Sequence, residues 1–153
     1  MKPKFSKWAS WSERNKLDGI KYPGVYALAV SEIDLSNKKY SVRKEIECFG
    51  MTNSIGGLKS RLKQFDNTII GKSGHGGAAR FLCGYKNYTY NIFSKKIFVS
   101  ICPIECDVTS NNPKDLLKMG DVARLEYFCF AQYAKRFKKL PKFNDKKESP
   151  KHK

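Results

Sequence analysis

The nine residues from Tyr22 to Val30 constrain the fold more than any other stretch of the chain. They read Tyr-Pro-Gly-Val-Tyr-Ala-Leu-Ala-Val and are apolar at both odd and even positions. A strand with one face in water would alternate between apolar and polar residues. The run therefore predicts a central strand that is buried on both sides and that begins after the Pro-Gly pair.

Two other stretches predict strands. After the turn signal Ser36-Asn37, the chain alternates from Tyr40 through Val42 and Ile46 toward Cys48, with charged residues between them. This pattern predicts a second strand, antiparallel to the first. The segment from Ile97 to Ile101 predicts a third strand.

Two longer helices and one short helix are expected. Apolar residues recur at helical spacing after the pair Gly56-Gly57, which predicts a helix over residues 57–66, with Thr52, Asn53 or Ser54 as its cap. The same periodicity predicts a longer helix over residues 121–139, which ends before Pro141. Between these helices lies a glycine-rich loop over residues 67–79, and a short helix is expected over 78–83.

The length and charge of the chain indicate its organisation and its partner. At 153 residues the chain has the size of one domain. We expect a basic extension at residues 1–21 whose Trp8 and Trp11 pack in the core or stack on bases, a folded domain at 22–144, and a basic, disordered tail at 145–153.

Thirty Lys and Arg stand against fourteen Asp and Glu, a formal charge of +16. This excess indicates a polyanion as partner, and nucleic acid before a membrane surface, although an idle basic surface is the alternative. The sequence has neither a signal peptide nor an apolar run of the roughly 20 residues that span a bilayer. We therefore expect a cytoplasmic protein with reduced cysteines.

Three side chains have positions that call for a chemical explanation. Arg61 lies on the apolar stripe of the first helix, where its guanidinium must pair with another group, snorkel to water or receive an anion such as phosphate. Glu126 lies among apolar neighbours on the last helix and needs a cation, which a salt bridge or a divalent metal would provide. His75 lies among glycines, where an imidazole can contact a ligand or move protons near neutral pH.

Several separated motifs together resemble the GIY-YIG nuclease family. They are Gly24-Val-Tyr26, Cys48-Phe-Gly50, Leu58-Lys-Ser-Arg61, Glu126 on a late helix and Asn144 after Leu140-Pro-Lys-Phe. The order and spacing match over residues 22–144, which would form the nuclease domain. The resemblance implies an α+β fold with a small three-stranded antiparallel sheet flanked by helices. It also implies metal-dependent hydrolysis of DNA phosphodiester bonds.

The resemblance also implies roles for single residues. Arg61 would hold the phosphate, Glu126 would bind Mg2+ or Mn2+, and Tyr26 would position or deprotonate the attacking water. Asn144 would support the site, and His75 would be a general base or a phosphate contact. We expect four basic residues to contact the DNA backbone: Lys59, Lys63, Lys72 and Arg80.

The chain departs from the family pattern at Cys48, where the second motif normally has a tyrosine. Either that tyrosine is dispensable, or Tyr22, Tyr40 or Tyr85 approaches the site, or activity is impaired. The first hypothesis is thus a DNA endonuclease, and the second is a DNA-binding module that keeps the fold without catalysis. An RNA-binding protein is a third reading, which the charge permits and the motifs do not support. The substrate sequence and the oligomeric state stay open.

Overall fold

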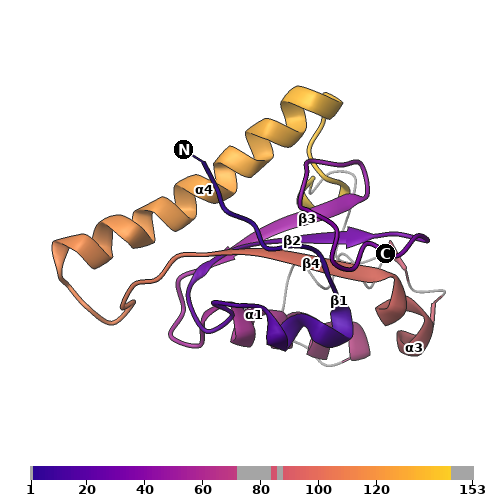
Figure 1. Cartoon of the computed structure of the whole chain (residues 1–153), viewed down its shortest axis with the longest axis horizontal. Coiled ribbons are helices and arrows are strands. Elements are labelled where there is room, and N and C mark those ends of the chain that lie inside the picture. The colour runs from indigo at the N-terminus through magenta and orange to yellow at the C-terminus, as the bar shows by residue number, and fades with distance from the viewer. Residues whose placement is uncertain (1, 72–83, 86–87, 146–153) are drawn as a thin grey trace.

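The computed structural model describes residues 2–71, 84–85 and 88–145. Its centre is an antiparallel sheet of four strands in the order β1-β4-β2-β3 (Figure 1). The strands are β1 (Ala9–Ser10), β2 (Gly24–Val30), β3 (Ile46–Thr52) and β4 (Ile97–Pro103). The predicted combination of an antiparallel sheet with helices is confirmed, but the described sheet has one strand more than the three expected.

Two long helices cover the two faces of this sheet. Helix α4 (Pro113–Phe137) lies over one face and α1 (Gly57–Ile70) over the opposite face (Figure 1). The shorter helices are η1 (Trp11–Lys16), α3 (Tyr90–Phe93), η2 (Ser94–Lys96) and η3 (Lys142–Asn144). Within the described ranges, no helix is long and apolar enough to cross a bilayer.

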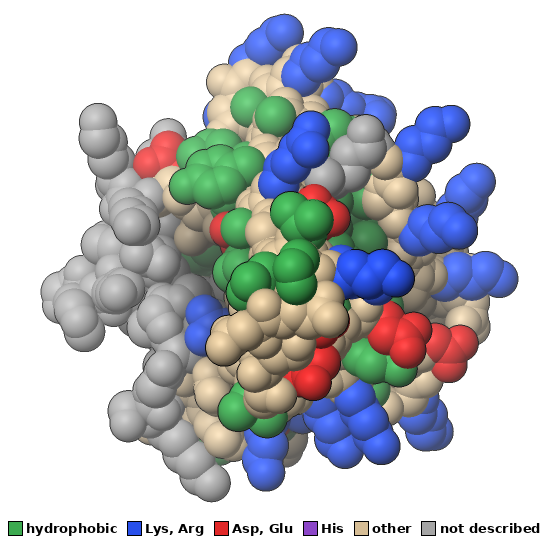
Figure 2. Space-filling view, turned by 90° about the vertical axis from the view of Figure 1, so that its left-hand side faces the viewer, with side chains coloured by type: hydrophobic (Ala, Val, Ile, Leu, Met, Phe, Trp, Pro, Cys, Tyr) green, Lys and Arg blue, Asp and Glu red, His purple; other side chains and the backbone are tan. Residues whose placement is uncertain are grey.

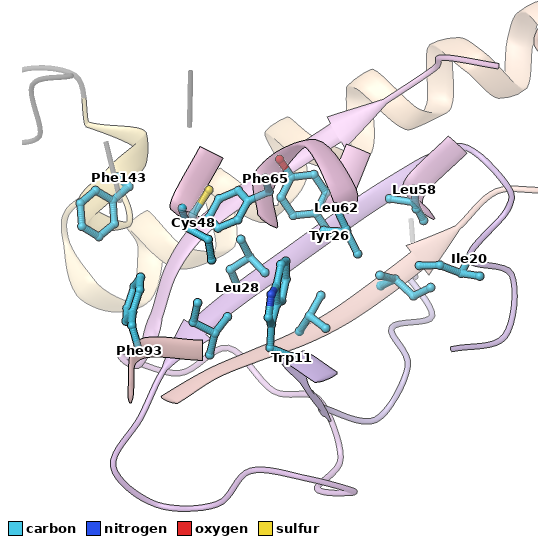
Figure 3. Close-up of a cluster of buried hydrophobic side chains, with 14 residues drawn as sticks. Trp11, Ile20, Tyr26, Leu28, Cys48, Leu58, Leu62, Phe65, Phe93 and Phe143 are labelled. Carbon is cyan, nitrogen blue, oxygen red and sulfur yellow. The ribbon is translucent and has the colours of Figure 1, made fainter. Parts of the chain in front are cut away.

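Strand β2 is the central strand that the apolar run predicts. It pairs with β3 on one side and β4 on the other, and six of its seven residues are buried. Tyr26 and Leu28 belong to the core on the α1 side (Figure 3), whereas Val25, Ala27 and Ala29 belong to the core on the α4 side. Both faces are covered, which explains why the strand needs apolar residues at every position.

The second predicted strand begins later than expected. The ladder between β2 and β3 starts at Ile46 and runs to Thr52, because Tyr40 and Val42 pack against the α4-side core from outside the sheet. The register shifts between Leu28 and Ala29. The antiparallel pairing with β2 is confirmed.

The N-terminal segment is part of the fold. Ala9 pairs with Val99 and Ser10 with Phe98, so β1 extends the sheet beyond β4. Trp8 and Trp11 are each only 1% exposed, which leaves no ring surface for stacking on bases. The packing alternative for the two tryptophans is therefore confirmed, and residues 1–21 include a strand that the sequence did not reveal.

Helix α4 begins eight residues before the predicted start. Pro113 occupies the first turn, and the Asn112 side chain caps the helix by accepting a hydrogen bond of 2.9 Å from the Lys114 amide. The helix ends at Phe137 because Lys138 has a left-handed backbone, with φ of 63°. The predicted end before Pro141 is correct to within two residues.

Helix α1 is four residues longer than predicted and takes up the start of the expected loop. The Thr68 hydroxyl donates a hydrogen bond of 3.1 Å to the Gln64 carbonyl, and Ile69 is buried. The polar pair Asn67-Thr68 therefore continues the helix instead of ending it. The rest of the glycine-rich loop and the short helix expected over 78–83 lie outside the described residues, as does the tail from residue 146.

Candidate active site

Tyr26 reaches from β2 across its neighbour β3. It lies opposite Gly50 in the register, and a Cβ atom added to Gly50 would be 2.2 Å from both the Cζ and the hydroxyl oxygen of Tyr26. The ring therefore lies directly over the Gly50 backbone. Because β3 is an edge strand of the described sheet, the hydroxyl points toward the open edge of the sheet.

Helix α1 presents Arg61 to the same region. Leu58, Leu62 and Phe65 form its buried side and pack on the sheet (Figure 3). Arg61 is partly buried beside them, and its guanidinium Nε is buried with no hydrogen-bond partner among the described residues. A buried donor without a partner costs free energy, so the guanidinium has a vacant bonding position in this structure.

Backbone hydrogen bonds, rather than a polar side chain, fix the start of α1. Its cap residue is Gly56, which makes no side-chain cap, so the expected capping by Thr52, Asn53 or Ser54 is wrong. Instead, the Leu58 amide donates to the Tyr22 carbonyl at 2.9 Å and the Lys59 amide to the Ile20 carbonyl at 2.7 Å. Gly57 has φ of 63° and a Cβ there would be 2.1 Å from the Lys21 carbonyl oxygen, so the tight junction requires glycine.

The carboxylate of Glu126 extends from α4 on the opposite face of the sheet. Partial burial raises the pKa of Glu126 above its ordinary value, while the charge of Arg61 opposes that rise. Glu126 makes no hydrogen bond and no ion pair within the described part of the chain. It is thus a partly desolvated carboxylate without a contacting cation, which is the state of a side chain that can accept one.

The electrostatics of Tyr26 connect all three side chains. Burial raises the pKa of Tyr26 far above its usual value, and the neighbouring Cys48 and Glu126 add to this rise. The charge of Arg61 and a hydrogen bond from its guanidinium lower the pKa of Tyr26 in turn. Tyr26, Arg61 and Glu126, which come from three different elements, therefore lie close enough to influence one another at the edge of β3.

This arrangement can bind an anion and a cation side by side. Arg61 supplies positive charge and unused donor capacity, and Glu126 supplies a carboxylate that is not neutralised by direct contact. Tyr26 stays a neutral phenol at physiological pH, so it can donate or accept a hydrogen bond but is a poor base. A phosphate group bound together with a hydrated divalent ion fits these three functions.

Cys48 does not provide the function of a tyrosine. It lies opposite Leu28 in the register, is 3% exposed and belongs to the core between the sheet and α1 (Figure 3). A thiol at this position fills space and does not reach the sheet edge as a phenol would.

None of the three tyrosines proposed as substitutes shows an interaction with Arg61 or Glu126. Tyr22 donates a hydrogen bond to Glu105, and Tyr40 stacks on Phe5 in the other core. Tyr85 donates to the Glu47 carboxylate at 2.5 Å. Among described residues, the structure therefore offers no replacement for the missing phenol beside Tyr26.

Asn144 has a clear structural function near the site. Its Oδ1 accepts a hydrogen bond from the Phe49 amide at 2.9 Å, and its Nδ2 donates to the Phe49 carbonyl at 2.9 Å. The side chain thereby occupies the backbone hydrogen-bonding groups of β3 on its open edge, next to Gly50. Asn144 holds the strand that carries the site and is a positioning residue.

The structure describes only two of the remaining predicted site residues. Lys59 and Lys63 are exposed on α1, one helical turn apart, so both amines are free to approach a DNA backbone. His75, Lys72 and Arg80 lie outside the described residues. Arg61, by contrast, is partly buried, and its Nε is not accessible to solvent.

The described residues contain no cluster of side chains that would form a further metal site. In residues 2–71, 84–85 and 88–145, no group of three or more His, Cys, Asp or Glu residues could hold an ion. The single carboxylate of Glu126 still fits Mg2+, which binds through one or two carboxylates and keeps several waters.

Sequence reasoning missed two other carboxylates, of which Asp66 is buried and Glu47 is half-buried. Asp66 accepts hydrogen bonds from Trp11 Nε1 at 2.7 Å and from the Tyr90 hydroxyl at 2.5 Å, and pairs with Arg14 at 3.4 Å. Its three partners, Trp11, Arg14 and Tyr90, line a surface cavity of about 940 Å³, which none of the three site residues lines. These bonds satisfy Asp66 and indicate a structural role that only the folded chain reveals.

The other missed carboxylate, Glu47, lies on the same edge strand as Gly50. Burial raises the pKa of Glu47, and the hydrogen bond from Tyr85 and the charge of Lys142 oppose that rise. The alternation of β3 predicts an outward, solvated position for this residue. Glu47 lies where the register shifts between Leu28 and Ala29 of β2, and this shift cannot be recognised in the sequence.

Comparisons with protein-family models, with curated proteins and with solved structures found no match for this chain. The functional argument therefore rests on the residues and on the geometry described above.

Proposed function

We propose that this chain is a metal-dependent DNA endonuclease that hydrolyses phosphodiester bonds. The observation that carries the proposal is that Tyr26 of β2, Arg61 of α1 and Glu126 of α4 act on one another electrostatically in the folded chain. These three residues are among the five to which the family resemblance assigns a role in catalysis, the others being His75 and Asn144.

Each residue has a function that its surroundings support. Glu126 would hold Mg2+ or Mn2+, because its carboxylate is partly desolvated and has no cation in contact. A bound divalent ion would supply Lewis-acid stabilisation of the phosphate and its leaving oxygen. Arg61 would bind a phosphate oxygen through its unused donor capacity.

Tyr26 is better suited to orient the attacking water than to deprotonate it. Its buried phenol has a raised pKa, so the phenolate is scarce at neutral pH. The raised pKa thus favours positioning over the base function that the resemblance also allows. His75 stays the proposed general base, on the strength of its glycine-rich surroundings in the sequence.

The DNA partner follows from charge. The formal charge of +16 gives a salt-dependent attraction to the phosphate backbone that needs no base contacts. Lys59 and Lys63 place two exposed amines on the helix that also carries Arg61. We propose that these lysines, with Lys72 and Arg80, hold the backbone of the strand that is cut.

Cleavage of end-labelled DNA tests this proposal. Purified protein is incubated at low salt with Mg2+ or Mn2+, with EDTA as the metal control, and the products are separated on a denaturing gel. We expect metal-dependent cleavage that Arg61→Ala reduces by about 10²–10³-fold. Arg43→Ala is the control, because Arg43 forms an ion pair with Glu45, at a distance of 2.6 Å, and is not one of the three site residues. Cleavage that is equally strong in both variants would refute the proposed function of Arg61.

A second function is favoured by one specific observation. Cys48 is buried and no described tyrosine replaces the missing phenol. A DNA-binding module without catalysis would keep the basic surface and tolerate this loss. It predicts salt-sensitive DNA binding that Glu126→Gln leaves unchanged, with no cleavage in either metal.

A further inference from the structure

The outward face of α4 carries an exposed aromatic side chain beside the candidate site. Tyr127 is 72% exposed, although it follows Glu126 directly in the sequence. Surface helices of globular proteins normally present polar residues to solvent. Four residues before and four residues after Tyr127, however, the exposed positions are Ala123 and Ala131. These small side chains leave the tyrosine ring open to a large ligand.

Aromatic contacts hold this ring in place. The Tyr127 ring meets the Phe130 ring edge to face, with centroids 5.8 Å apart. Phe130 in turn meets Phe49 of β3 edge to face at 6.2 Å, and Phe49 is buried. Tyr127 is therefore the outer end of an aromatic row that is anchored in the core, which lowers the entropy cost of using it as a binding surface.

The same row is continuous with the candidate site. Phe130 is four residues after Glu126 and three after Tyr127, and side chains at these spacings are neighbours on a helix surface. Glu126, Phe130 and Tyr127 therefore lie on neighbouring positions of one side of α4, and the Phe130 and Tyr127 rings are in contact. A ligand whose phosphate lies at Glu126 and Arg61 would place its next group over these two rings.

Cations lie along the same helix. Arg124 is exposed one turn before Tyr127, and Lys135 is exposed two turns after it. Neither forms an ion pair among the described residues. Eleven residues of helix separate them, a distance of about 16 Å. Figure 2, which faces the beginning of α4, likewise shows hydrophobic side chains in the open among Lys and Arg side chains.

We propose that Tyr127 and Phe130 form a platform for an unpaired base of the DNA substrate. The inference rests on the proposed nuclease function and names its substrate class, which is single-stranded DNA or DNA with an unpaired segment beside the cut. Exposed aromatic rings between cations are the surface that binds single strands, because every base can stack and every phosphate is attracted. In an intact duplex the bases are stacked on each other and cannot cover the ring.

A second copy of the chain is the less favoured occupant of this face. Two chains of charge +16 repel each other, and Arg124 and Lys135 would lie within the contact. A polyanion, by contrast, is attracted by the same charges. The charge of the surface therefore selects nucleic acid over self-association.

The experiment compares binding of matched single-stranded and duplex oligonucleotides that contain the fluorescent base 2-aminopurine, without metal. We expect Tyr127→Ala to reduce the ratio of single-strand to duplex affinity about 5- to 100-fold, the loss of one stacked base. Tyr127→Trp should restore the ratio and the quenching of 2-aminopurine that accompanies stacking. Leu117→Ala is the matched control, because Leu117 is also 72% exposed on α4 but has no aromatic ring.

Each result has one meaning for the proposal. An unchanged ratio in Tyr127→Ala, or an equal loss in Leu117→Ala, overturns the base platform. A wild-type dimer that Tyr127→Ala dissociates in sedimentation also overturns it, because the face would then be a protein interface. Cleavage is measured separately with Mg2+. If the wild type never cuts but the Tyr127-dependent ratio persists, the nuclease proposal fails and the platform stands.

Discussion

Replacing Gly50 with alanine tests the contact that directs Tyr26 toward the sheet edge. The added Cβ would be 2.2 Å from the Cζ and the hydroxyl oxygen of Tyr26, whereas real Cβ atoms essentially never come within 3.0 Å of another heavy atom. The ring cannot withdraw easily, because Tyr26 is 1% exposed and packed in the α1-side core. The two paired strands must therefore separate or the ring must leave its position.

The free energy of unfolding that Gly50→Ala loses should lie at the upper end of the range seen when a core is overpacked. Inserting one carbon into a well-packed core typically costs 1–3 kcal/mol, and contact with two atoms of an immobile ring indicates about 3 kcal/mol. With a urea m-value of about 2 kcal/mol per M, the unfolding midpoint should fall by about 1.5 M. The fluorescence of the two buried tryptophans, Trp8 and Trp11, reports the transition. Cleavage should fall as well, because the phenol is displaced.

Two further variants make this prediction specific. Gly120→Ala, in open space on α4, should stabilise the protein by about 0.5–1 kcal/mol through helix propensity. In a double-mutant cycle, Gly50→Ala should cost almost nothing in a Tyr26→Leu background, because the atoms that clash are gone. A wild-type midpoint for Gly50→Ala, or additive losses in the cycle, would refute the packing described here.

Three other predictions concern the charges and the support of the site. Glu126→Gln should raise the free energy of unfolding at pH 7 by up to about 1 kcal/mol in urea titrations. Folding raises the pKa of the Glu126 carboxyl, so the folded protein loses stability as the pH rises through that pKa, and the glutamine avoids this loss. A variant that is less stable than the wild type would contradict this prediction. Arg61→Ala should raise the pKa of Glu126 further in an NMR titration, because the opposing charge is removed, and an unchanged pKa would show that the two groups are not neighbours. Asn144→Ala should lower the free energy of unfolding by about 2 kcal/mol, because two hydrogen bonds to Phe49 are lost. The control Asn111→Ala, at an exposed position, should lower it by less than about 0.5 kcal/mol. Equal small losses in both variants would be inconsistent with the supporting function of Asn144.

The elements with strong local patterns could be predicted from the sequence, and the others could not. Apolar residues at every position of β2 signal a central strand, and this is correct because both faces are covered. The beginning of α4 was missed because residues 113–120 are largely exposed and have no apolar periodicity, although Asn112 and Pro113 mark the start. β1 was missed because its partner in β4 lies about 90 residues away in the chain, and two residues carry no periodic signal.

The candidate site could be predicted residue by residue but not as an arrangement. Arg61 and Glu126 were recognised because each is a charge among apolar neighbours on its helix. Their electrostatic interaction depends on α1 and α4 lying on opposite faces and on β3 being an edge strand, which residue spacing does not specify. Tyr127 was overlooked for the same reason, because exposure beside Glu126 is a property of the folded helix.

The most direct test of the central claim is nicking of supercoiled plasmid by the wild type, Glu126→Gln and Asp121→Asn in Mg2+ or Mn2+. Both substitutions neutralise one carboxylate on α4, but Asp121 is exposed and is not one of the three site residues. We expect nicking by the wild type and by Asp121→Asn, and a loss of about 10²–10³-fold in Glu126→Gln. Intact plasmid with the wild type in both metals, or undiminished nicking by Glu126→Gln, would contradict the central claim.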